Sequence, residues 1–122
     1  PNLTCLDHLV LTVASIDTTC AFYCNVLAME KQVFHPGDGT IRVALKFGTQ
    51  KINLHQAGAE YEPKSHVPTP GSADLCFLTD APLIAWQAVF SKHDIPIEQG
   101  PVARTGATGP ITSLYVRDPD GN

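Results

Sequence analysis

Apolar residues in the first part of the chain are spaced so that they predict a strand followed by a helix. Residues 6–13 hold aliphatic and β-branched side chains without helical spacing, which indicates a strand buried on both faces. In residues 18–27 the apolar side chains form one stripe at helical spacing, and Ser15 and Asp17 are suitable helix caps just before them. The chain is therefore expected to open with β and then α.

Three more strands are predicted before the middle of the chain. Residues 31–34 and 40–47 flank the turn sequence Pro-Gly-Asp-Gly, and residues 51–55 form a further short strand. The first half is therefore predicted as a βαβββ module at about residues 3–56. The apolar content then falls and Gly, Pro and charged residues become frequent, so residues 57–71 are interpreted as a linker.

The same order of elements begins again after the linker. Residues 74–79 are predicted as a strand and residues 83–92 as a helix that starts after Pro82, followed by at best a short edge strand at 95–97. Residues 100–110 are predicted as a Gly- and Pro-rich loop, residues 111–116 as a strand and residues 118–121 as a turn shaped by its aspartates. We interpret residues 72–122 as a second module, produced by internal duplication, whose last strand is missing from the chain.

The side chains of a strand alternate between its two faces, and this sorts the polar residues of the predicted strands. In the first strand His8 lies opposite the face that holds Leu9, Leu11 and Val13. Asn53 and His55 share one face of their strand, and Asp74 and Cys76 share one face of theirs. We expect the apolar faces to pack on the helices, which leaves the polar side chains on the other side of the sheet.

Composition and charge restrict the classes of partner. The chain has 122 residues, of which 43% are hydrophobic and 16% charged, and this composition is typical of one globular domain. A net charge of −4 argues against nucleic acid and anionic membranes. No apolar run is long enough for a membrane-spanning helix, no signal peptide is visible, and the four cysteines lie in apolar runs that favour reduced, buried thiols. A cytoplasmic protein is therefore expected.

Several short motifs, in their order along the chain, resemble the vicinal-oxygen-chelate superfamily of glyoxalases, bleomycin resistance proteins and extradiol dioxygenases. The resemblance is closest to the lactoylglutathione-lyase-like, virulence-associated proteins that contain a glyoxalase domain, and it spans essentially the whole chain. The residues that carry it are Leu6-Asp7-His8, Phe22-Tyr23 before residues 26–29, Lys51-Ile52-Asn53-Leu54-His55, residues 71–76, residues 100–107 and residues 117–122.

The resemblance implies an α+β domain in which two βαβββ modules form a half-barrel cup, with the helices outside, and which assembles as a homodimer. In the family, one residue from each of four strands reaches a divalent metal in the cup. By position this implies His8, the region of Asn53 and His55, Asp74, and an acid beyond Asn122. Two positions depart from the glyoxalase I pattern, because Asp74 stands where that enzyme usually has His and Asn53 stands where it usually has Glu.

Two imidazoles and a carboxylate that converge from separate strands are costly to bury unless they pair or bind a cation. His8, His55 and Asp74 are therefore the candidate metal ligands, for zinc, nickel, iron or manganese. The alternative is that His8 and Asp74 pair with each other without any metal. Asn53 is a candidate substrate-binding residue, and Arg104 either binds an anionic group of the substrate or is a solvated loop charge.

The leading functional hypothesis is a metal-dependent enzyme of the glyoxalase type. Elemental analysis of the wild type and of the variant His8→Ala would test whether a metal is bound. It would act on a small oxygenated substrate, such as a hemithioacetal, a hydroxy-acid derivative or an epoxide, by metal-polarised proton transfer or addition. Glutathione enters only by analogy with the family. The rival hypotheses are a metal-free drug-binding protein of the bleomycin-resistance type and a dioxygenase with two His and one Glu around iron.

Overall fold

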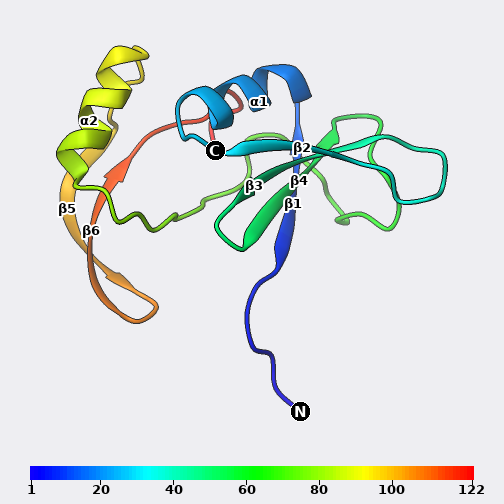
Figure 1. The fold of residues 1–122 in the computed structure, drawn as a ribbon, viewed down its shortest axis with the longest axis horizontal. Coiled ribbons are helices and arrows are strands. Elements are labelled where there is room, and N and C mark those ends of the chain that lie inside the picture. The colour runs from blue at the N-terminus through cyan, green and yellow to red at the C-terminus, as the bar shows by residue number, and fades with distance from the viewer. The chain divides into compact units, whose positions relative to one another are not determined.

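Four strands from the first half of the chain form one mixed sheet in the computed structural model, which describes residues 1–122 (Figure 1). The sheet is ordered β1-β4-β3-β2, with β1 parallel to β4 and the other neighbours antiparallel. The predicted βαβββ order is confirmed. Its elements are β1 (His8–Val13), α1 (Ile16–Asn25), β2 (Glu30–Phe34), β3 (Arg42–Phe47) and β4 (Gln50–Gln56).

Helix α1 begins where its capping residue predicts. The Ser15 hydroxyl accepts a hydrogen bond from the backbone N–H of Thr18 at 3.2 Å, so the helix starts at Ile16, two residues before the predicted boundary. At the other end the chain turns at Ala28, which has a φ of 59°. The backbone N–H of Met29 then donates to the carbonyl of Tyr23, which brings the chain directly into β2.

The hydrophobic core of this unit lies between α1 and one face of the sheet. On that face Leu11 and Val13 of β1 and the central residues of β3 and β4 are buried, whereas on the other face His8 and Val10 are exposed. The prediction that the first strand is buried on both faces is therefore wrong, because α1 covers only one of them. The largest fully buried side chains are Leu45, Ile52, Leu54, Val13 and Thr19.

The second half contains a helix and a two-stranded antiparallel sheet: α2 (Leu83–Lys92), β5 (Gln99–Gly106) and β6 (Gly109–Tyr115). The predicted helix is confirmed, and its C-cap is His93. The loop predicted at residues 100–110 is wrong, because these residues form most of β5 and the start of β6. The strands pair up to a two-residue connection between Gly106 and Gly109, and an irregularity between Gln99 and Val102 accommodates Gly100 and Pro101.

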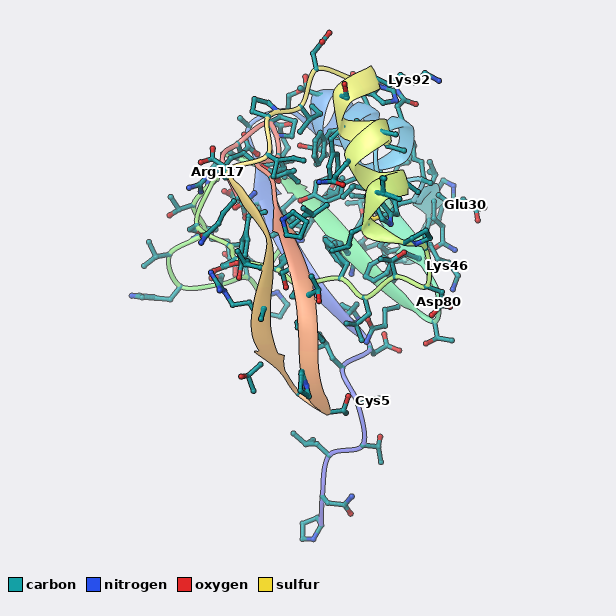
Figure 2. All side chains as sticks on the ribbon, turned by 90° about the vertical axis from the view of Figure 1, so that its left-hand side faces the viewer. Cys5, Glu30, Lys46, Asp80, Lys92 and Arg117 are labelled. Atoms are coloured by element: carbon teal, nitrogen blue, oxygen red, sulfur yellow. The ribbon has the colours of Figure 1, made fainter.

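The strand predicted at residues 74–79 does not form, so the second module has α2, β5 and β6 without a preceding strand. A strand needs the backbone hydrogen bonds of a neighbour, and none of the six strands pairs with this segment. Phe77 and Leu78 are exposed, and so is Cys76. Cys5 is exposed on the extended segment before β1 (Figure 2), so the prediction of buried thiols is wrong for these two cysteines.

Contacts along the chain divide it into two compact units, Pro1–Asp74 with Asp118–Asn122, and Leu75–Arg117. Neither helix has the length and apolarity needed to span a membrane.

The turn at residues 118–122 belongs to the first unit, and Asp118 holds it there. The buried Asp118 carboxylate accepts hydrogen bonds from the Tyr23 hydroxyl at 2.8 Å and the Asn122 amide at 2.8 Å, and from the backbone N–H groups of Asp120 and Asn122. Burial and the neighbouring Asp118 charge raise the pKa of Tyr23, so its hydroxyl stays protonated and donates. The prediction that the aspartates shape this turn through side-chain-to-backbone hydrogen bonds is confirmed.

Candidate functional site

The sheet face that points away from α1 carries polar side chains arranged in three rows across the strands. The pairing register defines each row, because directly paired residues point to the same face. Lys46 and its β2 neighbour Glu30 lie close together at one side of the sheet (Figure 2). The rows, in the order β1, β4, β3, β2, are His8, Lys51, Lys46, Glu30; then Val10, Asn53, Ala44, Gln32; then the two pairs Thr12 with His55 and Arg42 with Phe34, which continue the alternation beyond the last β3–β4 pair.

His8 is held by the carboxylate of Asp7. The Nδ1 atom of His8 lies 2.7 Å from Oδ2 of Asp7, and this hydrogen bond lowers the pKa of Asp7. An ionised carboxylate only accepts hydrogen bonds, so Nδ1 of His8 carries the proton, and in the neutral ring Nε2 keeps its lone pair. A histidine oriented by a carboxylate, with its second ring nitrogen free, is typical of metal-ligating imidazoles.

Asn53 carries a buried acceptor that the protein leaves without a hydrogen-bond donor. Its Oδ1 atom is shielded from solvent and has no partner. The cross-strand neighbours of Asn53 are Val10 and Ala44, whose side chains have no polar atoms. A buried unsatisfied acceptor is destabilising, and in native proteins such atoms are rare and often functional. Asn53 therefore fits the predicted role of a ligand-binding residue.

His55 is enclosed by aromatic and cationic neighbours. Only 7% of it is exposed, and its ring meets the ring of Tyr61 edge to face, with the centroids 5.4 Å apart. Tyr61 also lies under the Arg42 guanidinium, at 4.0 Å from its carbon to the ring centroid, and Arg42 pairs with Asp38 at 2.8 Å. Burial, and then the charge of Arg42, lower the pKa of His55, so its ring favours the neutral form.

Strand alternation correctly predicts that Asn53 and His55 share a face with His8, but the two imidazoles are not adjacent. His8 pairs with Lys51, four residues before His55, which corresponds to about 13 Å along the strand. Asp74 is exposed and lies outside the sheet. The carboxylate that contacts His8 is that of Asp7 and not that of Asp74. No group of three or more His, Cys, Asp and Glu side chains is arranged to hold a metal ion.

Two residues beside the predicted ones were not predicted from the sequence. Asp7 precedes the first residue of β1, so strand alternation does not place it, and only its position next to His8 could have indicated the contact. Lys51 has no predicted role of its own, although it lies two residues before Asn53 on the same face.

Arg104, predicted in a loop, lies in β5 of the second unit and is exposed. Its Nε donates to the Tyr115 hydroxyl at 3.0 Å and its Nη1 donates to the carbonyl of Ala103 at 2.9 Å. Binding of an anionic substrate group by Arg104 stays a prediction.

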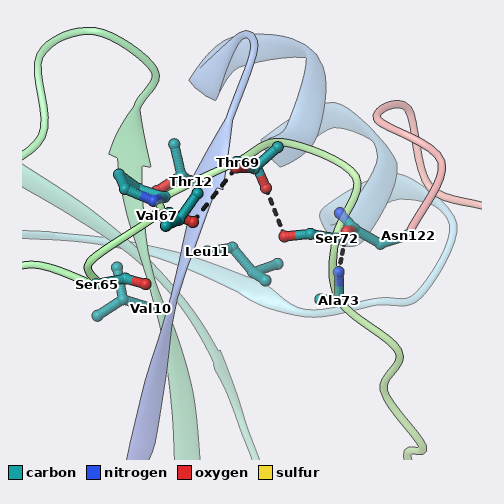
Figure 3. Close-up of a pocket in the computed structure, with 10 residues that line it drawn as sticks. Val10, Leu11, Thr12, Ser65, Val67, Thr69, Ser72, Ala73 and Asn122 are labelled. Atoms are coloured by element: carbon teal, nitrogen blue, oxygen red, sulfur yellow. Dashed lines mark hydrogen bonds between the residues drawn. The ribbon is translucent and has the colours of Figure 1, made fainter.

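A small cavity of about 100 Å³ lies between β1 and the linker (Figure 3). Val10 and Thr12 line it from the polar face of β1, and the linker contributes Ser65, Thr69 and Ser72, whose hydroxyls make the lining mostly polar. The Ser72 hydroxyl donates to the carbonyl of Thr69, and Asn122 accepts from the backbone N–H of Ala73. The cavity is smaller than the pockets that hold drug-sized ligands.

The enclosure of His55 predicts a specific pH dependence of stability. Because the pKa of the folded ring lies below its ordinary value of 6.5, the unfolded chain binds the proton more readily below pH 6.5, and stability falls with decreasing pH until the lowered pKa is passed. We expect His55→Gln to reduce this loss, measured by urea unfolding between pH 7 and 5. The exposed His35 provides the control, because His35→Gln should leave the wild-type pH profile unchanged. A profile in H55Q as steep as that of the wild type would contradict the expected neutral ring.

Several known proteins are similar to this chain in sequence. The family model for the Glyoxalase/Bleomycin resistance protein/Dioxygenase superfamily matches residues 5–122. Virulence protein STM3117 of Salmonella typhimurium is 54% identical over 117 residues, which cover 96% of this chain and 78% of that protein. Glyoxalase domain-containing protein RDO1 of Mycosarcoma maydis is 52% identical over 117 residues, and the match spans 96% of this chain but only 64% of that protein.

Solved structures show how far the similarity extends in three dimensions. The crystal structure of STM3117 matches with a TM-score of 0.94 and 52% identity, over 100% of this chain and 94% of that one. The lactoylglutathione lyase of Agrobacterium tumefaciens matches with a TM-score of 0.70 and 26% identity, over 99% of this chain and 90% of that one. The resemblance predicted from the sequence motifs, and the α+β fold class, are confirmed.

Proposed function

Because the chain belongs to the Glyoxalase/Bleomycin resistance protein/Dioxygenase superfamily, we propose that it is a glyoxalase-type enzyme domain with His8 at its reacting centre. The observation that carries the proposal is the pairing of His8 with Asp7, which leaves Nε2 free on the sheet face that also holds the unpartnered oxygen of Asn53. The similarity to a lactoylglutathione lyase supports a small oxygenated substrate.

The residues of the polar face fit a divalent metal in part. His8 has the orienting carboxylate and the free nitrogen of a ligand, whereas the His55 ring is enclosed by Tyr61 and Asp74 lies outside the sheet. His8 is therefore the residue of the predicted set that would hold the ion. Further ligands would have to be groups other than His55 and Asp74, because no three His, Cys, Asp or Glu side chains are arranged around a common metal position. A bound divalent ion would polarise a substrate oxygen and stabilise the negative charge that develops on it during proton transfer or addition.

The protein's own groups divide the remaining work. Asp7 fixes the orientation of the His8 ring and holds the proton on Nδ1, which keeps Nε2 available. Asn53 orients the substrate by accepting a hydrogen bond from it at Oδ1, an interaction that the protein alone does not provide. Lys51, the cross-strand partner of His8, lies two residues before Asn53 in β4. The Cα atoms of His8 and Asn53 are therefore about 8 Å apart, a distance that a small substrate can span.

Elemental analysis after loading with zinc, nickel, iron or manganese tests this proposal. We expect the wild type to retain a stoichiometric amount of one of these metals and His8→Ala to lose it. Asp7→Asn leaves the His8 imidazole present but should weaken metal affinity about 10- to 100-fold, because the orienting carboxylate is lost. His35→Ala is the matched control, since His35 is an exposed histidine outside the sheet, and it should retain the metal. A metal-free wild type after all four loadings, or equal retention in H8A, would contradict the proposal.

A further inference from the structure

Lys51 places an ammonium group on the polar face without a carboxylate partner. The side chain is half-buried and its Nζ lies 4.3 Å from the centroid of the Phe34 ring. Lys51 forms no ion pair, and its direct cross-strand neighbours are Lys46 and His8. Like charges opposite each other destabilise a sheet, so an anion from solution would relieve the repulsion between Lys51 and Lys46. The Asp7 carboxylate, whose pKa the charges of Lys51 and Lys46 help to lower, is already bonded to His8.

Asn53 has a second unmet requirement next to Lys51, because its buried oxygen lacks a hydrogen-bond donor. Oδ1 of Asn53 is buried without a partner, and its neighbours Val10 and Ala44 offer no hydrogen-bonding side chain. Lys51 and Asn53 are separated by one residue in β4, so they point to the same face with their Cα atoms about 7 Å apart. The flexible lysine can bring its ammonium closer than this to the Asn53 amide.

We propose that Lys51 and Asn53 form a subsite for a carboxylate that bears a neighbouring hydroxyl group, as in a 2-hydroxy acid. The carboxylate pairs with the Lys51 ammonium and the hydroxyl donates to Oδ1 of Asn53, so each group satisfies one unmet requirement of the face. The inference rests on the proposed function, because it names the substrate class for the face that holds His8.

Lactate and propionate are suitable probes because they differ only in the 2-hydroxyl group. Their affinities are measured by NMR titration of the protein in EDTA, so that chelation of a metal by lactate does not contribute. We expect the wild type to bind lactate about fivefold more tightly than propionate, as one additional hydrogen bond to a buried acceptor requires. Equal affinity for the two acids, or no binding of lactate, would overturn the proposal.

Substitutions separate the two contacts. Lys51→Met should weaken both acids about tenfold or more, whereas Lys51→Arg, which keeps a cation, should retain most of the affinity. Asn53→Val should weaken lactate to the level of propionate and leave propionate unchanged. Lys31→Met is the matched control, because Lys31 is an exposed lysine on the opposite face of β2, in register with Leu45. Unchanged binding in K51M, or a surviving lactate preference in N53V, would contradict the assigned contacts.

Failure of the Lys51–Asn53 subsite can be distinguished from failure of the proposed function. Acid binding in EDTA does not depend on the His8 Nε2 atom acting as a metal ligand. A protein that binds lactate through Lys51 and Asn53 but retains no metal would refute the metal assignment and support the subsite. A protein that retains metal through His8 but binds lactate and propionate equally would refute the subsite alone.

Discussion

Asp118→Ala is expected to lower the free energy of unfolding by about 3 to 5 kcal/mol. The buried carboxylate accepts four hydrogen bonds, and its loss leaves the buried Tyr23 hydroxyl and the backbone N–H groups of the turn without their acceptor. The contact with Tyr23 spans 95 positions of sequence and ties the turn to α1. Urea denaturation, followed by circular dichroism, measures the effect.

Tyr23→Phe provides the control for this prediction. It removes only the hydroxyl that donates to Asp118 and is expected to cost about 1 to 1.5 kcal/mol. The loss of unfolding free energy in the double mutant should be smaller than the sum of the losses in the two single mutants, because both substitutions remove the same hydrogen bond. Strict additivity, or a loss below about 1 kcal/mol in D118A, would show that the Asp118 network does not anchor the turn.

Leu45→Ala is expected to destabilise the first unit by about 2 to 5 kcal/mol, since it leaves a cavity at the centre of the core. Leu45 is completely buried in β3, and its side chain points to the face covered by α1. The unfolding midpoint in urea should fall while the denaturant dependence stays unchanged, which identifies a loss of stability without a change of the folded state.

Val33 is the matched control for Leu45. It lies on the same face of the sheet but in the edge strand β2, where 50% of it is exposed. Val33→Ala should therefore cost less than about 1 kcal/mol. Similar losses in L45A and V33A would contradict a core that is centred on β3 and β4.

The first module could be predicted from the sequence because its signals are local. Alternation in β1 and β4 correctly placed His8, Asn53 and His55 on one face, since the period of a strand is set by its own backbone. The capping hydroxyl of Ser15 likewise marks the helix start without reference to the rest of the fold. These residues were sufficient to propose a polar face with a histidine and an amide.

The errors lie where structure depends on distant partners. Residues 74–79 have strand composition but no neighbour in either sheet, whereas the Gly- and Pro-rich residues 100–110 form paired strands because a two-residue connection folds them back on each other. The surroundings of the site residues were equally non-local: Tyr61 encloses His55, and Phe34 approaches Lys51 from β2. Such contacts depend on register and side-chain packing, which periodicity alone does not specify.

The tautomer and ligand state of the His8 ring test the central claim most directly. Nitrogen-15 NMR of the histidine side chains should show His8 protonated on Nδ1 in its neutral form, with Nε2 unprotonated. On addition of zinc, the Nε2 resonance of His8 should shift while those of the exposed His35 and His66 stay in place. A proton on Nε2 of neutral His8, or a zinc response confined to the other histidines, would contradict the claim that Asp7 prepares His8 for the reacting centre.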